Sequence, residues 1–249
     1  MNDKPHPNDL RFGAVAFLDA LGFKGIWSRY APRDVIHNLR GVTFGDPMYQ
    51  DPPLDLERCS LASSVVTLSD TIVVSAAVTA KFASIDVTTD LECQVVALAS
   101  VCSKAGTIRS MILNSNTPLV YRAAVAVGEF VHDDRFLMGP AIDEAAEQER
   151  HAAGGLVWLT ASAAKVVYEA RREGLFGDLE LFLVSDYPVP MKDGDHLASV
   201  VNPLRFDFNH DRFLERVEAT FTDCREDVQR KRTNTMAFLR HARGALVPV

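Results

Sequence analysis

The sequence is poor in the residue patterns that bind zinc or build disulfide frameworks. Its four cysteines are scattered over 249 residues, and no two of them form a Cys-x-x-Cys pair. The seven histidines are equally dispersed, with no pair at metal-ligand spacing. These absences exclude a zinc knuckle and a disulfide-stapled scaffold, and they favour a reducing compartment.

Motifs that would assign a function directly are missing as well. The chain has no Gly-x-x-x-x-Gly-Lys phosphate loop, no Gly-x-Gly-x-x-Gly fingerprint and no Gly-x-Ser-x-Gly elbow. The sequence offers no apolar run that we expect to cross a membrane, and the polar residues 1–11, with two prolines, are unlike a signal peptide. We therefore expect a cytoplasmic protein without membrane contact.

Positive charge is in the minority. The chain carries 26 Lys and Arg against 33 Asp and Glu, which argues against nucleic acid or a membrane surface as partner but allows a locally basic pocket. The length suits one domain with a sizeable core. We expect an extended or disordered N-terminus over 1–11, a catalytic domain over 12–205 and a helical C-terminal extension over 206–249.

What is present centres on residues 14–23, Ala-Val-Ala-Phe-Leu-Asp-Ala-Leu-Gly-Phe. The apolar run is typical of a strand buried on both faces, and it ends at the carboxylate of Asp19. The backbone of Leu21, Gly22 and Phe23 can turn its N–H groups toward an anion. Two interpretations have equal weight here: Asp19 caps the following helix, or it binds a hard metal beside a triphosphate.

Apolar periodicity predicts the order β-α-β-β-α-β-β-α-β-α-β. Two βαβ units joined by a hairpin indicate an α+β fold of the ferredoxin-like, split βαβ type, with a mainly antiparallel central sheet flanked by helices. Strands are expected at 65–68, 72–74, 123–128, 156–159 and 179–185. Helices are expected at 24–40, 90–113, 141–151, 161–173 and 223–243.

A second acid interrupts the predicted hairpin. Ser69-Asp70-Thr71 separates two β-branched runs and predicts a tight turn. A split βαβ sheet places the first strand beside this hairpin, so Asp19 and Asp70 would face each other. Two close carboxylates repel unless a divalent cation lies between them, so the pair predicts a two-metal site. The alternative is that Asp70 is only a turn residue.

Four motifs then occur in order, and over Phe12 to Val184 they make the chain resemble the class III nucleotide cyclases. They are Phe17-x-Asp19-x-x-Gly22-Phe23, Thr67-Leu68-Ser69-Asp70, Arg122-x-x-x-x-x-Gly128-Glu129 and Gly139-Pro140-Ala141-Ile142-Asp143-Glu144-Ala145-Ala146. The resemblance implies that Asp19, Asp70 and the carbonyl of Ala20 hold two Mg²⁺ or Mn²⁺ ions. It also implies a homodimer, because the family forms its active sites between two such domains.

The base-reading positions depart from the family. Where purine cyclases carry polar residues that read the base, this sequence has Val66 and Phe136. The resemblance therefore implies a smaller, pyrimidine base stacked on Phe136, although a plain core aromatic is the alternative. Tyr49, in the long loop 41–58, either narrows the base pocket or is an ordinary surface tyrosine.

The transition-state positions depart too. Asp143 stands where the family has an asparagine, and Glu147 stands where it has an arginine. A carboxylate cannot neutralise phosphate charge. Arg150, seven residues after Asp143 and on the same face of a helix, is the candidate replacement.

Other basic residues have weaker claims. Lys192 lies roughly where the family has a lysine for the terminal phosphate. Arg122 is a lesser phosphate candidate, for which a surface ion pair is the preferred expectation. The basic run 230–232 is expected to be a solvated face.

With the purine code absent, the chain most resembles the pyrimidine cyclases of Pycsar antiphage systems. This implies conversion of UTP to 3′,5′-cyclic UMP and diphosphate, the product activating a separate effector. The alternatives are a cyclase for CTP and one for a purine triphosphate. A silent domain that binds nucleotide or only dimerises is the non-enzymatic alternative, disfavoured by the two retained aspartates and favoured by the missing asparagine and arginine.

Overall fold

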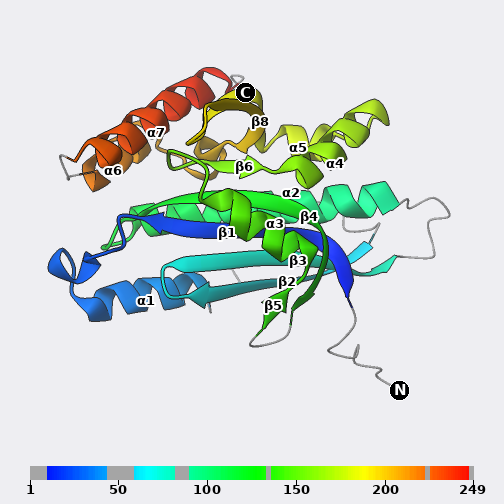
Figure 1. The fold of residues 1–249 in the computed structure, drawn as a ribbon, viewed down its shortest axis with the longest axis horizontal. Helices are drawn as coiled ribbons and strands as arrows, with labels where there is room; N and C mark the ends of the chain where they lie inside the picture. Colours follow the sequence, from blue (N-terminus) through cyan, green and yellow to red (C-terminus); the bar gives the residue numbers. More distant parts are fainter. Residues whose placement is uncertain (1–9, 44–58, 82–89, 133–135, 222–224, 247–249) are drawn as a thin grey trace.

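The computed structural model describes residues 10–43, 59–81, 90–132, 136–221 and 225–246 (Figure 1). Its strands form one sheet in the order β2-β3-β1-β4-β6-β8-β7, with β5 paired to β4. Among the described strands only the β4–β6 pairing is parallel. The strands are β1 (Arg11–Leu21), β2 (Cys59–Leu68), β3 (Thr71–Lys81), β4 (Val120–His132), β5 (Leu137–Met138), β6 (Val157–Leu159), β7 (Leu183–Pro190) and β8 (Asp195–Val201).

Helices cover both faces of this sheet, which confirms the predicted α+β class with a mainly antiparallel centre (Figure 1). In the view of Figure 1 one short helix, α3, lies in front of the sheet and the long α2 lies behind it. The helices are η1 (Ile26–Ser28), α1 (Pro32–Thr43), α2 (Asp90–Asn114), α3 (Pro140–Glu149), α4 (Ala161–Arg172), α5 (Gly177–Glu180), η2 (Pro203–Phe206), α6 (His210–Thr220) and α7 (Glu226–Gly244).

The central strand β1 is buried on both faces, as its continuous apolar run predicts. Ala14, Ala16 and Leu18 point into the core under α2, whereas Val15 and Phe17 point to the face that α3 covers. Neighbouring side chains alternate between faces in a strand, so Asp19 continues the row of Val15 and Phe17. The carboxylate therefore emerges on the α3 face, at the end of a strand that is buried on both faces.

Helix α2 corrects one expectation drawn from the sequence. Its 25 residues are long and apolar enough to span a membrane, although no such run was expected. In the structure 83% of its most apolar window is buried inside the protein. That burial is the behaviour of a core helix packed against β1, β3 and β4.

The expected helix over 24–40 is wrong in its first half. The chain leaves β1 through two glycines in the left-handed region, Gly22 (φ 74°) and Gly25 (φ 77°), and then makes only one 3-10 turn. The longer helix starts at Pro32, a residue that suits the first turn of a helix but breaks a helix interior. Pro32 thus separates the 3-10 turn from α1, two segments that the apolar periodicity had predicted to be one helix.

The end of the domain also differs from the prediction. The strand expected at 179–185 begins only at Leu183, after the short helix α5, and it continues to Pro190. A further strand, β8, pairs with it and with β6. The expected polar, helical C-terminus is present as α6 and α7, and both pack onto this part of the sheet through buried Phe213, Phe238 and Leu239.

Candidate active site

The two predicted metal carboxylates lie at one end of the sheet. Asp19 lies near the end of β1, where it is paired with Thr71 of β3 on one side and with Arg122 of β4 on the other. Asp70 lies in the two-residue turn between β2 and β3, and its carbonyl accepts a hydrogen bond from the N–H of Ala20 at 3.2 Å. The structure thus brings together Asp19, Ala20 and Asp70, as the split βαβ topology predicted.

The turn that carries Asp70 has an uncommon backbone. Ser69 adopts φ 61°, a left-handed conformation that usually falls to glycine at the first central position of a tight hairpin. A serine there is strained, and such strain is concentrated at functional sites. The strained conformation of Ser69 therefore suggests that the turn serves to position the neighbouring Asp70, and not only to stabilise the hairpin.

A cavity of about 470 Å³ opens beside these residues. Asp19, Ala20, Asp70 and the predicted phosphate turn, residues 21–23, line it. On the strand, the N–H and C=O of a residue point to the same side, so the Ala20 carbonyl faces the Asp70 turn together with its N–H. One cavity therefore contains oxygen donors and a potential anion cradle side by side.

Arg122 holds Asp19 in place. Its Nη2 lies 3.0 Å from Asp19 Oδ2, and its Nε lies 2.5 Å from Glu149 Oε1. Its Nη1 also points at the carbonyls of Arg150 and Ala152, each 3.4 Å away. The expected ion pair of Arg122 is present, but it is not at the surface: the side chain is only 14% exposed and lies between two acids.

Glu149 is a site residue that the sequence analysis missed. It is 6% exposed at the end of α3, on the same face as buried Ala141 and Ala145. Burial raises the pKa of the Glu149 carboxyl to about 7; the positive charge of Arg122 opposes this rise, and the nearby Asp19 charge adds to it. A sequence signal did exist, because a glutamate at a position of the apolar helix face requires a buried partner.

The negative charges of Asp19 and Asp70 both affect the pKa of buried Tyr121. Burial raises the pKa of the Tyr121 hydroxyl, and the negative charges of Asp70 and Asp19 raise it further. Its oxygen has no hydrogen-bond partner among the described residues. Asp19 and Asp70 therefore both lie within electrostatic range of the same hydroxyl, as expected of a converging pair.

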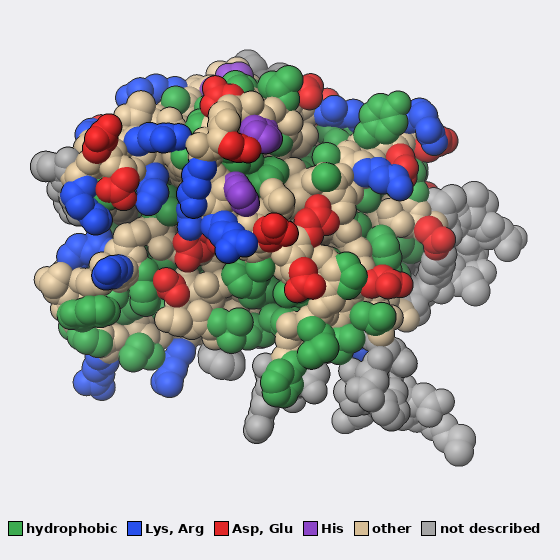
Figure 2. All heavy atoms as spheres, in the orientation of Figure 1, with side chains coloured by type: hydrophobic (Ala, Val, Ile, Leu, Met, Phe, Trp, Pro, Cys, Tyr) green, Lys and Arg blue, Asp and Glu red, His purple; other side chains and the backbone are tan. Residues whose placement is uncertain are grey.

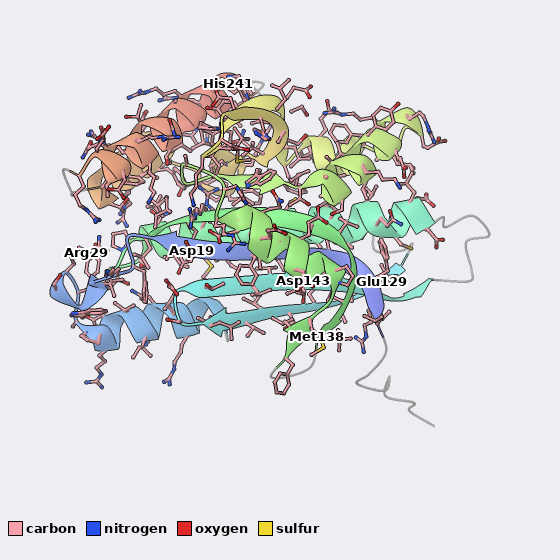
Figure 3. All side chains as sticks on the ribbon, in the orientation of Figure 1. Asp19, Arg29, Glu129, Met138, Asp143 and His241 are labelled. Carbon is pink, nitrogen blue, oxygen red and sulfur yellow. The ribbon has the colours of Figure 1, made fainter. Side chains whose placement is uncertain are left out.

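The turn after β1 has the features of a candidate anion site. The N–H groups of Gly22, Phe23 and Lys24 make no backbone hydrogen bond to another described residue. Arg29, labelled in Figure 3 at the outer end of this turn, donates from Nη2 to the carbonyl of Gly22 at 2.6 Å. Successive N–H groups around residues with positive φ form concave anion sites, and the side chains of Lys24 and Arg29 line the cavity beside them.

Residues near the C-terminus also line the cavity. They are Thr220 at the end of α6, Arg225 directly before α7, and Asp227 and Lys231 on α7. Within the expected solvated face over 230–232, Lys231 is 33% exposed and lines this cavity. Its neighbours do pair elsewhere: Arg230 donates to the carbonyl of Met191 at 3.3 Å, and Arg232 pairs with Glu218.

Three of the predicted groups lie outside this cavity. Asp143 is exposed in the first turn of α3, and Arg150 is exposed at the end of that helix. Lys192 is exposed in the turn between β7 and β8, where its N–H donates to the carbonyl of His151 at 3.1 Å. Neither Asp143, Arg150 nor Lys192 lines the cavity that holds Asp19 and Asp70.

The base-reading candidates are separated from that cavity along the sheet. Val66 pairs with Val73 on the face that α3 covers. Phe136 is 63% exposed just before β5, which pairs with the far end of β4. The ten-residue path from Arg122 to His132 along β4 spans about 33 Å, so Phe136 cannot contact a base bound beside Asp19 of its own chain. Tyr49 lies outside the described residues.

The donor set fits a hard divalent cation. Carboxylate and carbonyl oxygens are the ligands that Mg²⁺ and Mn²⁺ prefer. The described residues form no group of three metal-ligating side chains. Two carboxylates and the carbonyl of Ala20 would therefore hold metal only as part of a shell that water and substrate phosphates complete, which is how Mg²⁺ is usually bound.

Sequence comparisons with known protein families and with curated proteins find no match. The fold is similar to solved nucleotide cyclase domains. The guanylyl cyclase domain of the RhoGC fusion protein from the aquatic fungus Blastocladiella emersonii is 16% identical, over 77% of this chain and 95% of that one (TM-score 0.48). The adenylyl cyclase CyaB from P. aeruginosa is 11% identical, over 78% and 95% (TM-score 0.45). An adenylate/guanylate cyclase/hydrolase from Silicibacter pomeroyi is 14% identical, over 77% and 95% (TM-score 0.41).

Proposed function

We propose that this chain is a metal-dependent nucleotide cyclase that converts UTP to 3′,5′-cyclic UMP and diphosphate in the cytoplasm. The observation that carries the proposal is the convergence of Asp19 and Asp70 on one cavity whose other walls are an anion-binding turn and basic side chains. A triphosphate with a divalent cation needs both an acidic and a basic surface within a few ångströms.

The reaction assigns a role to each wall. The ribose 3′-oxygen forms a bond to the α-phosphorus, the bond from that phosphorus to the bridging oxygen breaks, and diphosphate leaves while the 3′ proton passes to solvent. Divalent cations held by Asp19, Ala20 and Asp70 would supply charge neutralisation. The turn at Gly22 and Phe23 binds phosphate oxygens, and Arg122 with Glu149 keeps the Asp19 carboxylate oriented.

The proposed enzyme is a homodimer with composite sites. Phe136 can act on a base only in the site of a second copy, because it is too far from Asp19 in its own chain. Exposed Phe12, Phe136 and Met138 support such an assembly, since an apolar surface at one end of the sheet suits a partner (Figure 2). Arg150 and Asp143 would be contributed in the same way.

The base preference follows from what Val66 and Phe136 lack. Neither side chain can hydrogen-bond a purine edge, and each unpaired buried group on the base would cost about 1–3 kcal/mol. A pyrimidine is smaller and can stack on Phe136. The proposal is UTP first and CTP second, with the cyclic product acting on a separate effector in antiphage defence.

The decisive experiment supplies the purified protein with each of the four nucleoside triphosphates and Mn²⁺ and identifies cyclic products by mass spectrometry. We expect cyclic UMP from the wild type. Asp70→Asn should lose activity by several orders of magnitude while remaining folded, because it removes charge but not shape. Asp193→Asn, in the exposed β7–β8 turn, is the matched control. Comparable cyclic AMP and cyclic UMP production would refute the base assignment, and an active Asp70→Asn would refute the metal assignment.

A further inference from the structure

The cavity beside Asp19 has basic side chains on two opposite walls that come from distant parts of the chain. Lys24 and Arg29 follow β1, whereas Arg225 and Lys231 belong to the start of α7. Figure 2 shows Lys and Arg side chains gathered at this end of the molecule, around the region where Figure 1 places the end of β1 and the helices α6 and α7. The cavity that holds Asp19 and Asp70 thus has basic residues from two distant parts of the chain in its lining.

The α7 wall is anchored rigidly. Thr235 is fully buried; its hydroxyl accepts a hydrogen bond from the N–H of Gly155 and donates to the carbonyl of Lys231, both at 2.7 Å. Asn234 donates to the carbonyl of Ala153 at 2.7 Å. Lys231 therefore lies one helical turn from an anchor to the strand that precedes α4.

The local partner of Lys231 is weak. Its Nζ lies 3.7 Å from Asp227 on the same helix, and 60% of the Asp227 side chain is exposed. Exposed pairs of this kind contribute little to stability. An ammonium group has three donors, so Lys231 can hold this contact and still bind an anion in the cavity.

We propose that Arg225 and Lys231 bind the terminal phosphates of the nucleoside triphosphate, so that the C-terminal extension is part of the substrate site. This inference rests on the proposed function, because it takes the ligand to be a triphosphate held at Asp19 and Asp70. A triphosphate carries more charge than one cation offsets. Lys24 and Arg29 on the near wall and Arg225 and Lys231 on the far wall supply further positive charge around its phosphates.

The proposal has a consequence for how the site is assembled. The metal carboxylates and the phosphate-binding cations belong to the same chain, whereas the base and transition-state candidates Phe136 and Arg150 lie outside this cavity. One protomer would thus bind the charged end of the substrate by itself. Its partner would add only the groups that select and convert the nucleotide.

The test measures binding rather than turnover. Calorimetry with the full chain and Mn²⁺ should show that inorganic tripolyphosphate binds about tenfold to a hundredfold more weakly to Lys231→Ala and Arg225→Ala than to the wild type. Binding of UMP, which lacks the terminal phosphates, should change less than about twofold. Lys231→Arg should restore much of the affinity. Arg240→Ala, exposed on the same helix, and Lys165→Ala, on α4, are controls expected to bind like the wild type.

The outcomes separate this inference from the proposed function. Variants that bind tripolyphosphate as the wild type does would overturn it, as would a wild type that binds none in the presence of Mn²⁺. Equal losses for UMP and tripolyphosphate would also overturn it, because they would indicate a general disturbance of the site. A wild type that binds tripolyphosphate through Lys231 but forms no cyclic nucleotide would reject the cyclase and leave the inference standing.

Discussion

Arg122 lies directly opposite Asp19 in the register of β1 and β4, and its Nη2 is 3.0 Å from the Asp19 carboxylate. The same guanidinium also contacts Glu149 of α3. One arginine therefore ties the central strand to the helix that covers it, at the place where the proposed metal ligand emerges. Its position links the stability of the fold to the geometry of the site.

The first prediction concerns this clamp. Arg122→Ala leaves Glu149 and Asp19 close together without their cation, so we expect the free energy of unfolding to fall by about 3–5 kcal/mol in urea titrations. Arg172→Ala removes an exposed pair with Glu173 and should cost less than about 1 kcal/mol. If the free energy of unfolding falls no more for Arg122→Ala than for the control, the contacts of Arg122 with Asp19 and Glu149 do not stabilise the fold.

The second prediction is a pH dependence. The pKa of Glu149 is raised to about 7 in the folded protein, above the ordinary value of a glutamate, so the folded state retains a proton that the unfolded state loses. Its contribution to stability therefore declines as pH rises through this interval. Glu149→Gln cannot ionise, so its stability relative to the wild type should increase from pH 5 to pH 8, measured by chemical denaturation without metal. Glu169→Gln on α4, whose partner is Lys165, is the control. A pH-independent difference would show that Glu149 has the same protonation in the folded and unfolded states over this range, so that folding does not raise its pKa.

The third prediction concerns the base. Phe136→Ala opens space at the proposed base position, so the ratio of kcat/KM for UTP over ATP should fall by about tenfold, even if both rates decline. Phe208→Ala, a fully exposed aromatic elsewhere, should leave the ratio unchanged. An unaltered ratio in Phe136→Ala would remove this residue from the pocket.

The fourth prediction tests the composite site. Asp19→Ala removes a metal ligand and Arg150→Ala removes the proposed transition-state cation, so each variant alone should be inactive. A mixed dimer would contain one site with neither change, so co-expression should restore activity to a sizeable fraction of the wild-type value. Failure of any mixture to recover turnover would show that Arg150 does not act across the interface.

The fifth prediction concerns the anchor of α7. Thr235→Val keeps the shape of the side chain but leaves the buried N–H of Gly155 without its acceptor, which should cost about 1–3 kcal/mol of stability. Because Lys231 lies one turn away, affinity for tripolyphosphate should fall as well. Thr233→Val, exposed on the same helix, should change neither measurement. A destabilised Thr235→Val that binds tripolyphosphate normally would show that the Thr235 hydrogen bond does not position Lys231 for phosphate binding.

Much of the fold could be predicted because its signals are local. The apolar run before Asp19 and the β-branched runs around Asp70 predicted the three strands β1, β2 and β3, and the topology then placed the two acids together. The failures are local as well. Pro32 ended the first expected helix early, and the turn at Gly22 and Gly25 replaced its start with left-handed backbone.

The sequence by itself determined that a carboxylate ends the buried strand and that a second one lies in a hairpin turn, because those facts depend on neighbours within a few residues. Only the tertiary structure decided that Arg122 and Glu149 surround Asp19 and that Lys231 reaches the same cavity. These arrangements join distant parts of the chain, from the first strand to the last helix. They depend on strand register, on the face of α3 that is buried and on how Phe238 and Thr235 fix α7 to the sheet, and no local pattern encodes such distances.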